Sequence, residues 1–184
     1  FDLIGGTSTG ALIASALALG KPASEIAGFY RERARSVFRQ GGRWKSGLAP
    51  IFDSRRLEAE IRREVGDLTL GDPALRTKLA IVAKRLDTGS PWILSNIPSA
   101  PYFADPDDGS YLGNRHYVLA RLLRASAAAP GFFRQETMEV RPGEPPGVFV
   151  DGGASPFNDP SLALFKLARM HTFGLRWPLG PDRM

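Results

Sequence analysis

The beginning of the chain constrains its fold more than any other stretch. Residues 1–4 form a short apolar run of the kind that ends a buried strand, and Gly5 and Gly6 interrupt it. Residues 11–19 are small or apolar helix formers, and Gly20 follows them as a helix stop. The order is therefore strand, sharp turn and helix. It predicts a fold in which a buried strand leads directly into a helix.

The remainder of the sequence alternates helical and strand patterns, without a repeat or a linker that would divide it. The expected helices follow Ser24 and Ser54 as N-caps, cover residues 118–129 and follow Pro160, and the expected strands are residues 79–83, 92–94 and 148–150. This alternation predicts an α/β sandwich in a single domain over residues 1–184. In such sheets, functional side chains lie at the carboxyl ends of strands.

Composition excludes several kinds of chemistry. The chain of 184 residues contains no cysteine, so disulfides, thiolate metal sites and a cysteine nucleophile are excluded. Its most apolar run, residues 11–19, is too short to span a bilayer. The formal net charge is +5, but no basic run is interleaved with aromatic residues. We therefore expect no nucleic-acid partner.

The turn at the start of the chain matches G-x-S-x-G, with Ser8 between Gly6 and Gly10. A serine on a tight strand-to-helix turn projects its hydroxyl from the sheet, and small neighbours let strand and helix approach closely. The N–H of Thr9, at the positive end of the helix, could stabilise an oxyanion. A phosphate-binding loop is excluded because Gly10 is followed by Ala11 rather than by lysine. An unreactive glycine-serine turn is the alternative.

A serine nucleophile needs a base, and the sequence offers two kinds. Asp151 directly follows the apolar strand at residues 148–150, and Gly152 and Gly153 allow a sharp turn beside it. His171 follows Asp151, so the order serine, aspartate, histidine also fits an α/β-hydrolase triad. His116 precedes an amphipathic helix, and we expect it to be exposed or hydrogen-bonded.

Several motifs together resemble the patatin-like phospholipases, in the same order and at similar separations. They are Gly6-Thr7-Ser8-Thr9-Gly10, Tyr111-Leu112-Gly113-Asn114, the segment 124–133 (RASAAAPGFF), Val150-Asp151-Gly152-Gly153 and Gly174-Leu175-Arg176-Trp177-Pro178. The resemblance implies a three-layer α/β/α sandwich and lipid acyl hydrolysis through an acyl-enzyme. It further implies a dyad of Ser8 as nucleophile and Asp151 as base, with no catalytic histidine, no metal and no organic cofactor.

The sequence departs from this family before the serine. The glycine-rich D-G-G-G-x-x-G loop that normally precedes the turn and lines the oxyanion hole is absent, as is a strand expected after Met184. We therefore expect the chain to be an incomplete fragment of the domain, with an apolar strand and a glycine-rich loop before Phe1 and a further part after its end.

The favoured interpretation is a phospholipase A-like serine esterase that uses Ser8 and Asp151. A hydrolase with a Ser8-Asp151-His171 triad and a non-catalytic lipid- or membrane-binding module are the alternatives. The expected partner is a phospholipid or another acyl ester, presented at a membrane or micelle surface, where loops containing Trp44 and Tyr102 could contact it. The expected location is cytoplasmic or peripheral at membranes.

Overall fold

The computed structural model describes residues 1–37, 50–178 and 180, without the side chains of residues 33–36. Its helices are α1 (Thr9–Ala18), α2 (Ala23–Val37), α3 (Ser54–Val65), α4 (Leu119–Ser126) and α5 (Ser161–Arg169), with short 3-10 turns η1 (Asn114–His116), η2 (Gly152–Ala154) and η3 (His171–Phe173). Its strands are β1 (Leu3–Thr7), β2 (Lys78–Arg85), β3 (Pro91–Ser95), β4 (Glu136–Met138) and β5 (Gly147–Asp151). Trp44 lies outside the described residues. None of the helices in the described part is both long and apolar enough to cross a membrane.

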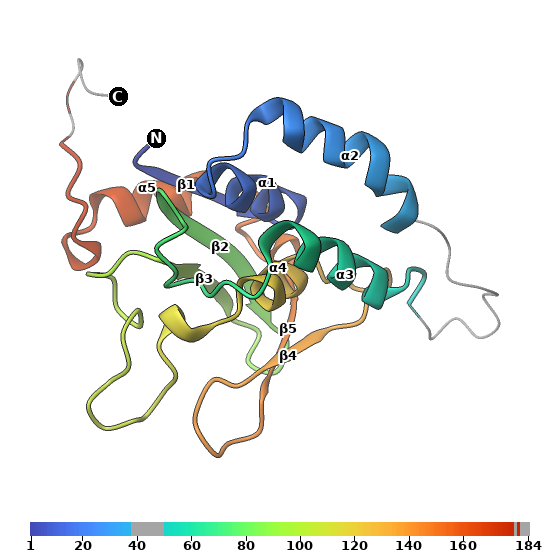
Figure 1. Ribbon diagram of the computed structural model, residues 1–184. Helices are drawn as coiled ribbons and strands as arrows, with labels where there is room; N and C mark the ends of the chain where they lie inside the picture. The colour runs from blue at the N-terminus through green and yellow to red at the C-terminus, as the bar shows by residue number, and fades with distance from the viewer. Residues whose placement is uncertain (38–49, 179, 181–184) are drawn as a thin grey trace.

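The strands form one mixed sheet, in which β2 is the central strand (Figure 1). On one side, β3 pairs with β2 in antiparallel orientation. On the other side, β1 runs parallel to β2 and ends with Thr7 opposite Val82, whereas β5 runs antiparallel and ends with Asp151 opposite Ala83. The carboxyl ends of β1 and β5 therefore meet end to end along the same edge of β2.

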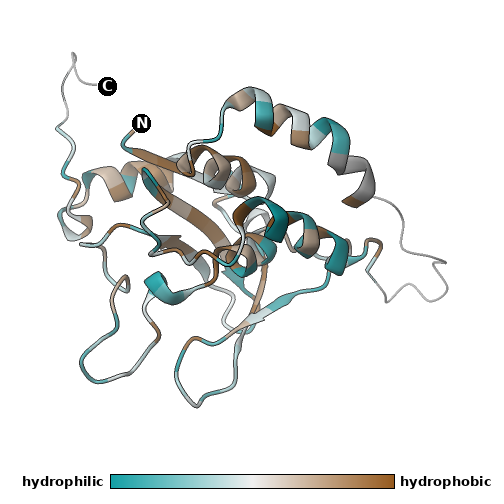
Figure 2. Cartoon of the chain, in the orientation of Figure 1, coloured by the Kyte–Doolittle hydropathy of each residue, from teal (hydrophilic) through white to brown (hydrophobic). Residues whose placement is uncertain are grey.

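Helices cover both faces of this sheet, as a three-layer α/β/α sandwich requires. Alternate residues of β2, such as Ile81, face the larger core under α1, α3 and α4, and Ala80 faces a smaller core under α5. In Figure 2, β1 and β2 are mostly brown and α3 is largely teal, consistent with a buried sheet and a solvated outer helix. α2 lies outside α1 and α3 (Figure 1).

Three expectations about local structure were wrong, and one strand was missed. Gly5 and Gly6 do not interrupt β1 but lie within it, and a Cβ at Gly5 would lie 2.4 Å from Leu164 of α5. Ser24 lies within α2, and the third helix is capped by Asp53, whose carboxylate accepts the N–H of Arg55. The short edge strand β4 was not expected, because its three residues carry too little pattern to predict.

Candidate active site

Ser8 occupies a strained turn between β1 and α1. Its backbone has φ 57° and ψ −126°, a combination that residues with a Cβ rarely adopt. A Cβ at Gly6 would lie 2.1 Å from the carbonyl of Gly10, so the turn requires glycine at position 6. A Cβ at Gly10 would meet nothing within 4 Å, so packing does not require glycine there. Thr9 begins α1, in the first turn, where helix N–H groups have no intrahelical acceptor.

Asp151 reaches Ser8 because their strands end at the same point of β2. The Ser8 hydroxyl donates a hydrogen bond of 2.6 Å to Oδ2 of Asp151, and the N–H of Gly153 donates one of 2.7 Å to Oδ1. A Cβ at Gly152 would lie 2.5 Å from the carbonyl oxygen of Val82. The two glycines that follow Asp151 thus have different roles. Gly152 allows close packing on β2, and the N–H of Gly153 fixes the carboxylate.

The environment of Asp151 favours its protonated form more than water does. The residue is only 6% exposed, and this burial raises the pKa of its carboxyl group. The hydrogen bonds from Ser8 and from the Gly153 N–H lower the pKa, but burial is the larger effect. A carboxylate with a raised pKa accepts a proton more readily than an ordinary aspartate does.

Neither histidine contacts this pair. His171 is exposed in η3, and His116 bonds instead to Oδ2 of Asp105 at 2.5 Å. Both carboxylate oxygens of Asp151 already accept hydrogen bonds, from Ser8 and Gly153. The geometry therefore brings Ser8 and Asp151 together and leaves His171 apart from them.

A cavity of about 230 Å³ opens beside Ser8. Apolar side chains form most of its wall, and Glu60 is the charged residue among them; the lining is Ser8, Thr9, Leu12, Phe29, Tyr30, Val37, Phe52, Leu57, Glu60, Ile61, Ala127, Ala129, Phe132 and Phe133. The hydroxyl of Tyr30 donates to the carbonyl of Thr9 at 3.1 Å, which ties α2 to the serine turn. Burial raises the pKa of Tyr30 to about 12, so this donor remains protonated at neutral pH. The mainly apolar lining suits an apolar ligand.

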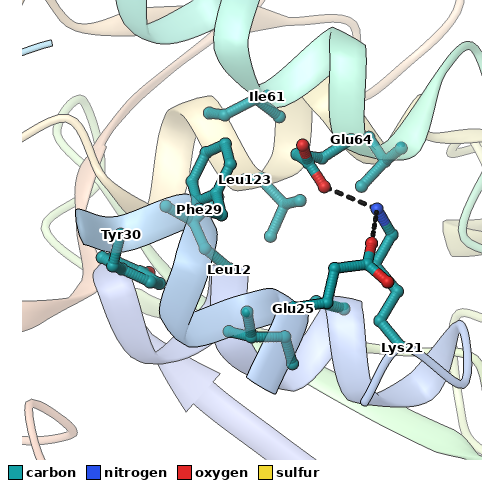
Figure 3. A pocket seen from close by; sticks show the side chains of 11 residues that line it. Leu12, Lys21, Glu25, Phe29, Tyr30, Ile61, Glu64 and Leu123 are labelled. Carbon is teal, nitrogen blue, oxygen red and sulfur yellow. Dashed lines mark hydrogen bonds and ion pairs between the residues drawn. The ribbon is translucent and has the colours of Figure 1, made fainter. Parts of the chain in front are cut away.

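A second, smaller cavity lies between α1, α2 and α3 (Figure 3). At one side of it, Lys21 points between Glu25 and Glu64, with Nζ 2.5 Å from Oε2 of Glu64 and 3.1 Å from Oε1 of Glu25. Phe29 and Tyr30 of α2 line this cavity as well as the one beside Ser8. The ion pairs and the two aromatic side chains hold α2 over the wall of the larger cavity.

Two residues at the site were not expected from the sequence. Thr7 is buried, and its hydroxyl donates to the carbonyl of Phe157 at 2.7 Å, which fastens the segment after Asp151 to β1. Ser126 is buried at the end of α4 and bonds to both the serine turn and β2. The available signal for Ser126 was its place among small residues at a helix end, which indicates close packing but names no partner.

No group of three or more His, Asp or Glu side chains in the described part of the chain is arranged to hold a metal ion.

A family model described as patatin-like phospholipase matches residues 1–164. The chain is 29% identical over 177 residues to a cGAMP-activated phospholipase of Escherichia coli (strain TW11681), covering 92% of this chain and 45% of that protein. It is 30% identical over 192 residues to calcium-independent phospholipase A2-gamma of Rattus norvegicus, covering 98% and 23%. It is 28% identical over 180 residues to Patatin-2-Kuras 4 of Solanum tuberosum, covering 91% and 44%. The chain spans less than half the length of each of these relatives.

Proposed function

This chain belongs to the patatin-like phospholipase family, and we propose that it hydrolyses acyl esters of phospholipids or related lipids with Ser8 as nucleophile and Asp151 as base. The observation that carries the proposal is the 2.6 Å hydrogen bond from the Ser8 hydroxyl to Asp151, beside an apolar cavity. A serine hydroxyl becomes a useful nucleophile when a positioned base can take its proton.

The first half of the reaction acylates Ser8. Asp151 takes the hydroxyl proton as Oγ attacks the ester carbonyl carbon, which forms a tetrahedral oxyanion. The Thr9 N–H, at the start of α1, is the donor that the turn offers to this oxyanion. When the tetrahedral species collapses, the proton on Asp151 passes to the departing alcohol and the acyl group stays on Ser8.

The second half restores the enzyme. Asp151, again ionised, takes a proton from water as the water oxygen attacks the acyl carbonyl. Collapse of the second tetrahedral species releases the fatty acid, and Asp151 returns its proton to Oγ of Ser8. The same carboxylate thus acts as base and acid in turn, and no second titratable residue is needed.

The cavity supports a substrate with an apolar acyl chain. Ser8 and Thr9 line it together with mainly hydrophobic side chains. These side chains would bury the acyl chain of the substrate while its ester carbonyl lies at Ser8. Phe132 lines the same cavity, is 47% exposed and stacks on Phe52, with ring centroids 6.0 Å apart. We propose Phe132, in addition to the loops expected from the sequence, as a contact with a lipid surface. Tyr102 is exposed, but it lines a different cavity, beside β3.

The experiment is hydrolysis of p-nitrophenyl esters and of phospholipid vesicles by the full-length protein and its Ser8→Ala variant. We expect the variant to fold, by circular dichroism, and to lose at least about 10³-fold in kcat/KM, as for loss of a nucleophile. Hydrolysis at the parent rate would make Ser8 a turn residue. Vesicle binding without turnover by the parent would instead support the lipid-binding module.

A further inference from the structure

We propose that Ser126 is a positioning residue, which holds Ser8 in its reactive conformation through the Ser8 backbone. This inference rests on the proposed function of Ser8 as nucleophile. Ser126 is not among the residues that line the cavity beside Ser8, and it would act through the backbone of another residue.

The contacts of Ser126 connect three elements. Its side chain is completely buried at the end of α4. Its hydroxyl oxygen accepts the backbone N–H of Ser8 at 2.9 Å, and the hydroxyl donates to the carbonyl of Val82 in β2 at 2.7 Å. One hydroxyl therefore serves as both donor and acceptor, and it links α4, β2 and the serine turn.

This hydroxyl lies where the sheet leaves a gap. The pairing of β1 with β2 ends where Thr7 lies opposite Val82, and β5 ends at Asp151, opposite the next residue of β2, Ala83. Neither strand continues past this junction, so the Ser8 N–H and the Val82 carbonyl each need another partner. The Ser126 hydroxyl is the partner of both groups. The N–H that it accepts belongs to Ser8, whose positive φ is otherwise unfavourable.

The consequence concerns the direction of the Ser8 hydroxyl. With the Ser8 N–H fixed by Ser126 and the hydroxyl bonded to Asp151, the nucleophile is held from two sides. Without the Ser126 hydroxyl, the part-buried Ser8 N–H loses its acceptor, and relaxation of the strained turn would move Oγ away from Asp151. Because the Ser8 N–H is engaged by Ser126, it is not available as an oxyanion donor.

The structure offers a matched control. Ser15, in α1, is also completely buried, but its hydroxyl has no hydrogen-bond partner within the described structure. Ser126→Ala and Ser15→Ala therefore remove the same atom from equally buried sites, with and without the bonds at issue. Ser126→Cys keeps a weaker donor and acceptor of similar shape, and it serves as the conservative variant.

The experiment measures kcat, KM and hydrogen exchange of the Ser8 amide in the full-length protein. We expect Ser126→Ala to lower kcat by about 10²-fold, the size of a misplaced reacting group, with KM little changed. Exchange of the Ser8 amide should become about 10-fold faster, as for loss of one hydrogen bond. Ser126→Cys should lie between Ser126→Ala and the parent, and Ser15→Ala should match the parent in both measurements.

The pH profile separates positioning from general loosening. If Ser8 moves away, Asp151 loses a hydrogen bond that lowers its pKa, so the acid limb of kcat/KM should move to higher pH in Ser126→Ala. Parent-like kcat and amide exchange in Ser126→Ala would overturn the proposal, as would equal losses in Ser15→Ala. A parent protein without esterase activity would refute the proposed function instead, and the amide exchange would still decide whether Ser126 fixes Ser8.

Discussion

Two carboxylates of this chain make equally short side-chain hydrogen bonds in different surroundings. Asp151 accepts from Ser8 at 2.6 Å, where β1 and β5 meet, and is buried. Asp105 bonds to His116 at 2.5 Å in a loop, where both side chains are more than 40% exposed. The pKa values of the two carboxyl groups are also shifted in opposite directions. Burial raises the pKa of Asp151, whereas the N–H of Gly113 and the His116 side chain lower that of Asp105.

The comparison shows that a short bond to a carboxylate does not by itself indicate catalysis. The aspartate-histidine pair contains the residue types of a catalytic pair, but it is exposed and stabilises the ionised carboxylate. The serine-aspartate pair lies beside an apolar cavity, and its surroundings disfavour the ionised form. Burial beside a substrate-sized space distinguishes a proton acceptor from an ordinary surface interaction.

The largest expected effect is a difference in kcat between variants of the two aspartates. Asp151→Asn preserves shape but removes the proton acceptor, so kcat should fall by about 10²–10⁴-fold, the range for loss of a general base. Asp105→Asn should leave kcat near the parent value. Steady-state kinetics on one ester substrate measure both. A comparable loss in the two variants would break the distinction between them.

The next effect separates two glycines of the serine turn by stability. A Cβ at Gly6 would collide with the backbone of Gly10 and force the turn to shift. Gly6→Ala should therefore lower the free energy of unfolding by about 1–3 kcal/mol, as for overpacking. A Cβ at Gly10 would meet nothing within 4 Å, so Gly10→Ala should leave the free energy of unfolding unchanged or slightly raise it. Urea titration measures both, and equal destabilisation would contradict the close approach at Gly6.

The smallest effect concerns stability against pH. Because the folded protein raises the pKa of Asp151, its stabilising contribution is present at low pH and declines as pH rises through the folded pKa. Asp151→Asn should therefore gain in Tm relative to the parent as pH rises from acid to neutral. For Asp105, whose pKa is lowered, the contribution is present at neutral pH and lost on acidification.

Asp105→Asn should consequently be less stable than the parent at neutral pH, and this difference should shrink in acid. Melting curves over a pH series test both signs. The same slope for the two variants would mean that their environments do not differ as described.

Local sequence predicted each half of the site but not how the halves meet. Ser8 and Asp151 were both expected at carboxyl ends of strands, because a glycine-rich turn and a D-G-G turn are short-range patterns. The end-to-end junction of β1 and β5 depends on their register against β2, which no short-range pattern encodes. Ser126 is 118 residues from Ser8 in sequence, so its bond to the turn could not be read from local chemistry.

In the proposed mechanism, Asp151 activates Ser8 without a histidine. The most direct test of this activation is the rate at which a fluorophosphonate probe labels Ser8 over a range of pH. The full-length parent, Asp151→Asn and a His116→Ala/His171→Ala variant would be compared, with the labelled peptide mapped. We predict labelling at Ser8, at the same rate and with the same acid limb in the parent and the histidine variant, and much slower labelling of Asp151→Asn at every pH. Labelling of Asp151→Asn at the parent rate, or slow labelling of the histidine variant while it remains folded, would contradict the account.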